Sequence, residues 1–253
     1  MKKIIFIISF LAILLSACAG IPNVPTANPS SVVNNNIGNE TNSTTPNSLP
    51  QTALATESAL IDSNNLAPQI STTPSSGLSQ EEIDAILYMR EEEKLARDVY
   101  LTLYNKWNLP LFNNIASSEQ AHTDAIKTLI TRYNLPDPFI DQIGVFSNPE
   151  IQDLYNQLVA RGNQSLSEAL KVGAAIEEID IQDLEKRMTI TSNTDIILVF
   201  QNLLYGSQNH LQAFVSTLQK QTGEGYQPQL LTPEEFQAIM SSTNRGNGGT
   251  QKP

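Results

Sequence analysis

Residues 112–122 read FNNIASSEQAH, and the helical pattern that begins there continues to Tyr133. Apolar residues recur at alternating steps of three and four, the spacing that aligns side chains on one face of a helix. Glu119 and His122 interrupt this face and lie one turn apart. Burying both without partners would cost on the order of several kcal/mol. The stretch therefore predicts an amphipathic helix whose polar pair needs a partner.

Two interpretations of Glu119 and His122 follow from their spacing. A Glu oxygen and a neutral His nitrogen three residues apart converge on one point, as the ligands of a metal ion do. A hydrogen bond between the two side chains, facing partial solvent, would satisfy them as well. The motif is short and arises by chance in many helices, so the rest of the chain has to decide between the two interpretations.

The segment 79–107 predicts the preceding helix, because it begins with the capping box SQEE and stops at an Asn-Leu-Pro break. Its apolar face contains one charge, Glu93. Glu93 could form a solvated pair with Arg97, but its place among apolar residues favours burial. The neighbours Glu91 and Glu92 fall off this face, and we do not expect them to be buried with Glu93.

A long connection follows, and Asn-Pro at its end predicts a short helix over residues 148–162. No side chain of this connection is assigned a chemical role. The next long helix is predicted at 167–188, with Glu177 and Asp180 on its apolar face. Both belong to the acidic run 177–185, most of which we expect to lie in solvent.

The last long helix begins near residues 192–195 and ends at Gly223, and a short helix follows at 232–240. The chain contains two histidines, His122 and His210, and both fall in the middle of helix faces that are otherwise apolar. Two incidental histidines would seldom be placed in this way. Their positions favour a metal site over an isolated Glu–His hydrogen bond.

The first 17 residues predict a secretory signal peptide. Two lysines precede an apolar run that is too short to span a bilayer. The run ends in LSAC, which resembles the lipobox of bacterial lipoproteins, where cleavage leaves the cysteine as the lipid-bearing first residue. Cys18 is the only cysteine, so no disulfide can form within the chain. We expect a protein that is anchored to a membrane of the cell envelope by lipid on Cys18, in the periplasm or at the cell surface.

The composition divides the remaining chain into three parts. Residues 18–77 are rich in Asn, Ser, Thr and Pro without a sustained apolar period, and they predict a disordered tether. The folded domain is predicted at 78–241, followed by a disordered tail at 242–253. The formal net charge is −11, and it becomes −13 when the two lysines of the signal are removed. Such a charge argues against nucleic acid as a partner.

Four long helices in two hairpins, with acidic residues on the first three and histidines on the second and fourth, resemble the ferritin-like superfamily. The segments 91–100 (EEEKLARDVY), 118–122 (SEQAH), 176–181 (IEEIDI) and 206–211 (GSQNHL) are more specifically similar to the DUF2202 family, over roughly residues 78–240. The resemblance implies an all-α fold, a ferritin-like antiparallel four-helix bundle with one long crossover that contains a short extra helix.

The resemblance also implies a site for two metal ions, iron or manganese, with zinc as the alternative. The ligand positions of the superfamily match five residues of this chain: Glu93, Glu119, His122, Glu177 and His210. Ser207 stands where the fourth helix of the superfamily carries a Glu, and Asp180, one turn from Glu177, is the candidate substitute. Glu93, Glu119 and His122 would hold one ion, with Glu119 able to bridge to the other. The missing carboxylate predicts that the second site is weaker, unless Asp180 completes it.

Three functions remain open from the sequence. The first is an envelope-anchored oxidoreductase whose two metal ions react with oxygen or peroxide, with Tyr100 either as an electron donor or as a core residue. The second is metal binding without turnover, and the third is a scaffold lipoprotein with a degenerate site, for which Ser207 is the best evidence. DUF2202 has no established activity to carry over, and a homo-oligomer is left open.

Overall fold

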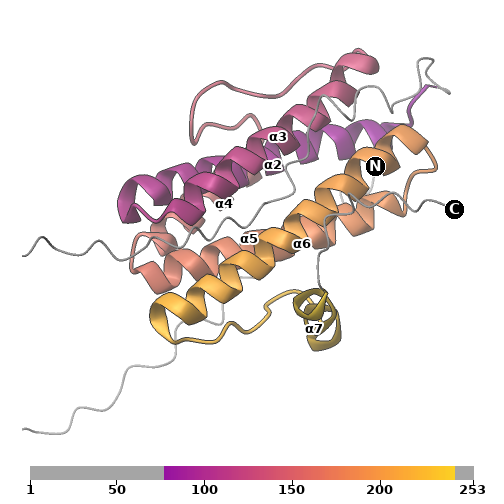
Figure 1. Ribbon diagram of the computed structural model, residues 1–253. Coiled ribbons are helices and arrows are strands. Elements are labelled where there is room, and N and C mark those ends of the chain that lie inside the picture. The colour runs from indigo at the N-terminus through magenta and orange to yellow at the C-terminus, as the bar shows by residue number, and fades with distance from the viewer. Residues whose placement is uncertain (1–76, 243–253) are drawn as a thin grey trace, which may run out of the picture. The chain divides into compact units, whose positions relative to one another are not determined.

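The computed structural model describes residues 77–242 and contains six helices and no strand in that range (Figure 1). In chain order they are α2 (Gln80–Trp107), α3 (Pro110–Arg132), α4 (Pro149–Gly162), α5 (Leu166–Met188), α6 (Thr194–Thr222) and α7 (Pro233–Ser241). The prediction of an all-α fold is confirmed for this part of the chain. The expected signal peptide, Cys18, the tether up to residue 76 and the tail from residue 243 lie outside the described residues.

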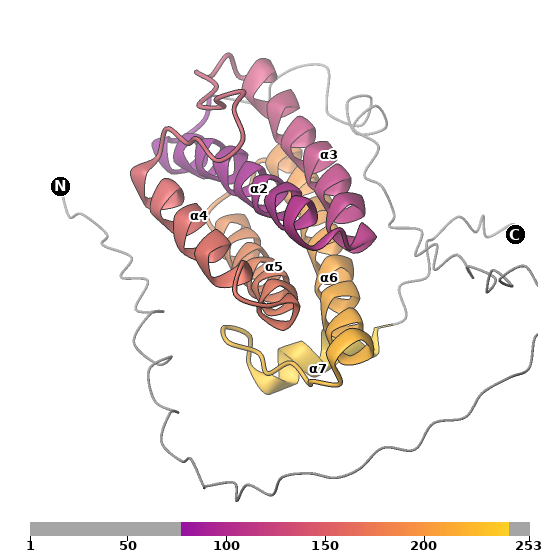
Figure 2. The ribbon, with the colours of Figure 1, turned by 90° about the vertical axis from the view of Figure 1, so that its left-hand side faces the viewer.

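The four long helices pair into two antiparallel hairpins, α2 with α3 and α5 with α6 (Figure 1). The hairpins lie side by side, so that α2 packs against α5 and α3 packs against α6. The short helix α4 belongs to the long connection between the hairpins, and it packs against both α2 and α5 (Figure 2). Helix α7 contacts α6. Each long helix therefore turns one side toward a common interior.

The helix ends follow local sequence signals. The Ser79 hydroxyl accepts a hydrogen bond from the backbone N–H of Glu82, and the Glu82 carboxylate accepts one from the N–H of Ser79. Asn108 ends α2 in the left-handed conformation, with φ of 50°, and Pro110 begins α3. Gly223 ends α6 in the same conformation, with φ of 74°. Because these residues satisfy or interrupt backbone hydrogen bonds locally, the sequence alone predicts where each helix stops.

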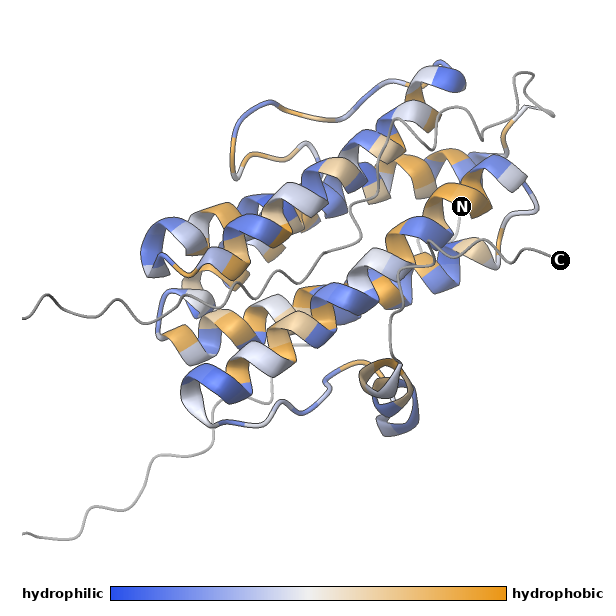
Figure 3. Ribbon diagram, viewed as in Figure 1, coloured by the Kyte–Doolittle hydropathy of each residue, from blue (hydrophilic) through white to orange (hydrophobic). Residues whose placement is uncertain are grey.

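Two hydrophobic clusters fill the interior, one toward each end of the hairpins. One contains the packed rings of Tyr100, Phe112 and Phe214, and the other contains Met89 and Phe200. Between them, at mid-length, polar side chains such as Glu93, Glu119 and Glu177 are buried. Hydrophilic and hydrophobic residues alternate along the long helices (Figure 3). Within residues 77–242, no helix is both long and apolar enough to cross a membrane.

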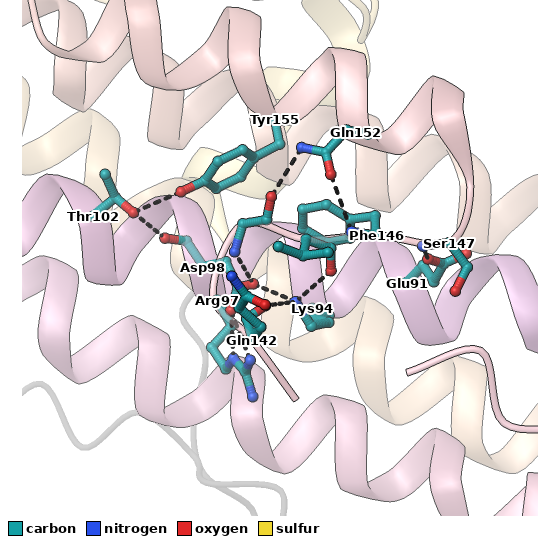
Figure 4. A network of polar contacts seen from close by, with 12 residues as sticks. Glu91, Lys94, Arg97, Asp98, Thr102, Gln142, Phe146, Ser147, Gln152 and Tyr155 are labelled. Carbon is teal, nitrogen blue, oxygen red and sulfur yellow. Dashed lines mark hydrogen bonds and ion pairs between the residues drawn. The ribbon is translucent and has the colours of Figure 1, made fainter. Parts of the chain in front are cut away.

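The long connection binds buried charges of α2, a role that the sequence did not suggest. The Lys94 ammonium is fully buried and donates hydrogen bonds to the Asp98 carboxylate at 2.5 Å and to the carbonyl oxygens of Gln142 and Val145 at 2.9 and 3.1 Å (Figure 4). The backbone N–H of Gly144 donates to the same Asp98 carboxylate at 2.9 Å. The connection is therefore held over α2 by charged hydrogen bonds, which are stronger than neutral ones.

The connection also overturns the expectation for Glu91 and Glu92. Both are buried, although they fall off the apolar face of α2. Glu91 accepts hydrogen bonds from the backbone N–H groups of Ser147 and Asn148, at 2.6 and 3.1 Å. Periodicity reports one face of a helix, whereas α2 is covered by the connection and by α5 as well as by α3.

The acidic run of α5 is also more buried than expected. Glu177, Glu178 and Asp180 are 1%, 0% and 4% exposed, so most of the run is not in solvent. Glu178 accepts hydrogen bonds from the Tyr226 hydroxyl at 2.6 Å and from three backbone N–H groups of residues 229–231. The segment between α6 and α7 therefore folds over α5 and satisfies this carboxylate.

Candidate metal centre

Polar side chains from all four long helices meet at mid-length, between the two hydrophobic clusters. Helix α2 contributes Glu93, α3 contributes Glu119 and His122, α5 contributes Glu177, and α6 contributes His210. Each of the five is at most 2% exposed. The structure thus brings together five of the six residues that the sequence suggests as metal ligands. They meet because each interrupts the apolar face that its helix turns inward.

Glu119 lies at the middle of this centre. One carboxylate oxygen, Oε2, is 2.8 Å from Nδ1 of His122, and the other, Oε1, is 2.7 Å from Nδ1 of His210. Glu93 Oε2 lies 3.1 Å from the same nitrogen of His122, and Glu177 Oε2 lies 3.5 Å from that of His210. The ligand atoms form two sets that share Glu119, and the atoms of each set lie within 4.8 Å of one another.

The two sets have the same composition, a carboxylate and an imidazole of their own plus the shared Glu119. The expectation of one tight and one weaker site concerns affinity and stays a prediction. The sequence assigned Glu119 to the set of His122, one turn away on α3, as a carboxylate able to bridge. In the folded chain the hairpin of α5 and α6 places His210 against the other oxygen of Glu119. Ser207 therefore does not leave the second set short of a carboxylate.

Asp180 is the sixth residue that the sequence suggested. Among the residues that the structure describes, it belongs to neither set, although it is only 4% exposed. Its Oδ2 accepts a hydrogen bond from the Ser207 hydroxyl, and its Oδ1 has no hydrogen-bond partner within residues 77–242. Ser207 and Asp180 thus form a pair beside the centre.

The donor set fits a metal ion by a test that uses this structure alone. Within residues 77–242, Glu93 Oε1, Glu119 Oε1 and His210 Nδ1 are buried and have no hydrogen-bond partner. Glu119 Oε1 and His210 Nδ1 are only 2.7 Å apart, yet they are not placed for a hydrogen bond. Buried polar atoms without partners cost free energy, which a cation between them would recover. Sets of two carboxylates and one imidazole suit iron and manganese, and zinc as well.

Comparisons with known proteins place this chain in a family. Residues 82–243 match the family described as an uncharacterized protein domain, DUF2202. The chain belongs to the DUF2202 family. An uncharacterized protein of Methanocaldococcus jannaschii, MJ0754, is 55% identical over 179 residues, which cover 70% of this chain and 96% of that protein. The crystal structure of the hypothetical protein MJ0754 from Methanococcus jannaschii has a TM-score of 0.67 at 53% identity, covering 69% of this chain and all of that one.

Three residues around the centre of this DUF2202 domain were not identified as contacts from the sequence. The Ser118 hydroxyl lies 3.0 Å from Nε2 of His210, and the Tyr100 hydroxyl donates to Glu177 Oε1 at 2.5 Å. Gly206 lies against the ring of His122, where a Cβ atom would come within 2.5 Å of Nε2. A glycine inside a long helix is the one signal that could have pointed to such a close approach. The partners of Ser118 and Tyr100 depend on how the helices pack.

The charges of the DUF2202 centre act strongly on one another. Burial raises the pKa of Glu93 to about 7, against the effect of the neighbouring His122. Burial acts to lower the pKa of His210, but the carboxylates of Glu119 and Glu177 outweigh it and raise the pKa to about 9. Burial disfavours the Glu119 anion, yet the two histidines hold its pKa below the usual range. The carboxylates and the imidazoles therefore stabilise one another's charged forms in this centre.

Proposed function

We propose that the DUF2202 domain is a ferritin-like four-helix bundle that binds two metal ions, iron or manganese, with zinc as the alternative. The observation that carries this proposal is Glu119, which turns one oxygen toward each histidine. The two hairpins of long helices support the bundle, and the equal composition of the two ligand sets supports two ions rather than one. The buried atoms without hydrogen-bond partners support a cation as the group that satisfies them.

We further propose that the centre is an oxidoreductase site for oxygen or peroxide. Glu93, Glu119, His122, Glu177 and His210 would hold a pair of iron or manganese ions, which would allow two electrons to be transferred without an organic cofactor. The protein contributes orientation and exclusion of water. A hydrogen bond between Ser118 and Nε2 of His210 leaves the Nδ1 nitrogen directed at Glu119. The Tyr100 hydroxyl donates a hydrogen bond to Glu177, and the Tyr100 ring packs on Phe214, with ring centroids 5.0 Å apart.

We propose that this activity lies in the cell envelope, outside the cytoplasm. The support is the lipobox-like segment that ends at Cys18, which would leave the protein attached to a membrane by lipid. The net charge of −11 gives no electrostatic attraction to anionic lipid or nucleic acid, so the acyl chains would supply the membrane attachment.

Metal analysis followed by oxidation tests the proposal in two steps. Purified protein is loaded anaerobically with ferrous iron, freed of unbound metal and analysed, and we expect two ions per chain. Glu119→Gln removes the shared carboxylate and should abolish tight binding of both ions. Glu185→Gln is the control, because Glu185 is exposed on α5 and its loss changes the net charge equally.

Addition of oxygen or peroxide to the loaded protein should then change its ultraviolet and visible absorbance within a single turnover. Two bound ions without such a change would leave metal binding without turnover as the function. No bound iron, manganese or zinc in the wild type would refute the proposed metal centre and favour a scaffold protein.

A further inference from the structure

Helices α2 and α5 are tied together at two levels, and these contacts determine which segments face each other. At the centre, the Tyr100 hydroxyl donates to Glu177. Further from the centre, the Arg187 guanidinium lies over the Tyr88 ring, 4.0 Å from its centroid. From the Tyr100–Glu177 contact to the Tyr88–Arg187 contact, the residue numbers fall along α2 and rise along α5. The two helices therefore run antiparallel. The residues between the two levels therefore face one another.

Four acidic side chains fall between these levels, and we call them the acidic row; their exposure decreases from Asp183 to Glu93, which belongs to the metal centre. The side chain of Asp183 is 25% exposed, Glu92 and Asp180 are each 4% exposed, and Glu93 is 1% exposed. Burial raises the pKa of Glu92 well above its usual range; the charge of Asp183 adds to this effect, and the Arg187 guanidinium opposes it. Burial raises the pKa of Asp180 too, and the charges of Glu93 and Glu92 add to it. Because α2 and α5 run antiparallel between the two contacts, the segment of α2 with Glu92 and Glu93 lies opposite the segment of α5 with Asp180 and Asp183.

Glu92 and Asp180, the two middle members of the acidic row, differ from the other buried acids of this domain. Within residues 77–242, both oxygens of Glu92 and Oδ1 of Asp180 are buried without a hydrogen-bond partner. Glu91 and Glu178 are equally buried, but backbone N–H groups donate to them. An acid that served packing alone would be expected to find such partners, because leaving a buried polar group unsatisfied is costly. Glu92 and Asp180 also lie outside both ligand sets.

We propose that Asp183, Glu92 and Asp180 form the route by which divalent cations pass between solvent and the metal centre, an inference that rests on the proposed function. A cation that leaves water needs oxygen ligands along its way, since an unpaired charge in a protein interior is very unfavourable. The unpaired carboxyl oxygens of Glu92 and Asp180 offer such ligands in succession.

The kinetics of metal uptake test this route separately from the centre itself. The probe is Co²⁺, whose visible absorbance changes on binding and can be followed by stopped flow. Glu92→Gln keeps the shape of the side chain and removes its charge. We expect the rate constant of uptake to fall by about tenfold, within the range by which charge placement alters association rates. Release of Co²⁺ into excess chelator should slow by the same factor. A residue of the route changes the activation barrier for passage, and it leaves the free energies of free and bound Co²⁺ unchanged.

Equilibrium measurements and two further variants complete the test. Glu92→Gln should still bind two ions per chain with unchanged Kd. Asp183→Asn, at the partly exposed end of the acidic row, should also slow uptake, and it keeps the size of the side chain that lies 3.8 Å from Arg187. Glu185→Gln, an exposed residue of the same helix, should take up Co²⁺ at the wild-type rate.

Three results would overturn the route. Uptake by Glu92→Gln and Asp183→Asn at the wild-type rate would show that cations reach the centre elsewhere. Loss of one bound ion in Glu92→Gln would make Glu92 a ligand. A wild type that binds no metal would refute the proposed function and the route together, whereas the first two results leave the proposed function intact.

Discussion

Replacing Gly206 by alanine connects packing directly to the metal centre. A Cβ atom at this position would lie 2.5 Å from Nε2 of His122 and 2.7 Å from its Cε1 atom. Ordinary contacts of Cβ atoms are 3.4 Å or longer, so the imidazole would have to move by roughly 1 Å. Metal–ligand distances tolerate only about 0.2 Å. Gly206→Ala should therefore remove His122 from its ligand set.

The expected stability change follows from two opposing effects. Alanine in place of glycine within a helix normally stabilises by about 1 kcal/mol, whereas overpacking a well-packed interior costs about 1–3 kcal/mol. The net result for Gly206→Ala is a loss of roughly 0–2 kcal/mol in the free energy of unfolding, measured by urea denaturation without metal. Calorimetric titration with Mn²⁺ should show one tight ion in place of two.

Gly173→Ala is the matched control. It lies inside α5, and its Cβ atom would come within 2.4 Å of the Phe214 ring, in the hydrophobic cluster rather than at a histidine. This variant should be destabilised to a similar degree or more, yet still bind two ions. If Gly206→Ala binds two ions with parental affinity, the role given to His122 is wrong. If it is more stable than the parent by the full helix-propensity gain, the close approach to His122 is wrong as well.

Three further predictions concern separate parts of the protein. Cys18→Ser should abolish signal processing and labelling by a radioactive fatty acid, and a labelled, processed product would contradict lipidation. Glu178→Gln should lower the free energy of unfolding by about 2–4 kcal/mol, because hydrogen bonds to a buried charged group contribute about 1.5–3 kcal/mol each; unchanged urea denaturation would contradict this. Mn²⁺ affinity should rise with pH up to about 9, because the folded-state pKa of His210 is raised to about 9 and only the neutral imidazole binds metal. Calorimetric affinities that do not change between pH 6 and 9 would exclude His210 as a ligand.

The sequence by itself determined the helices and their ends. Signals such as the capping box at Ser79, the break at Pro110 and the glycine at residue 223 act on the backbone hydrogen bonds of adjacent residues, and the structure confirms each boundary to within a few residues. The all-α class and the membership in DUF2202 are confirmed as well. The metal function and the lipid anchor stay predictions.

Only the tertiary structure decided how the acidic residues are used. Periodicity shows which face of a helix is apolar, and it cannot show what covers the other faces. Glu91 is satisfied by backbone groups 56 and 57 residues away, and Glu178 by groups up to 53 residues away. These partners arise because two long connections fold over α2 and α5, a consequence of packing that no local pattern encodes.

The sharing of Glu119 has the same origin. The spacing on α3 pairs Glu119 with His122, one turn away, and this pairing is visible in the sequence. The second pairing, with His210, exists only because the hairpin of α5 and α6 packs against that of α2 and α3 at one particular height. The sequence therefore determined the apolar face of each long helix and the polar residues that interrupt it, and the packing of the two hairpins determined which of these residues meet.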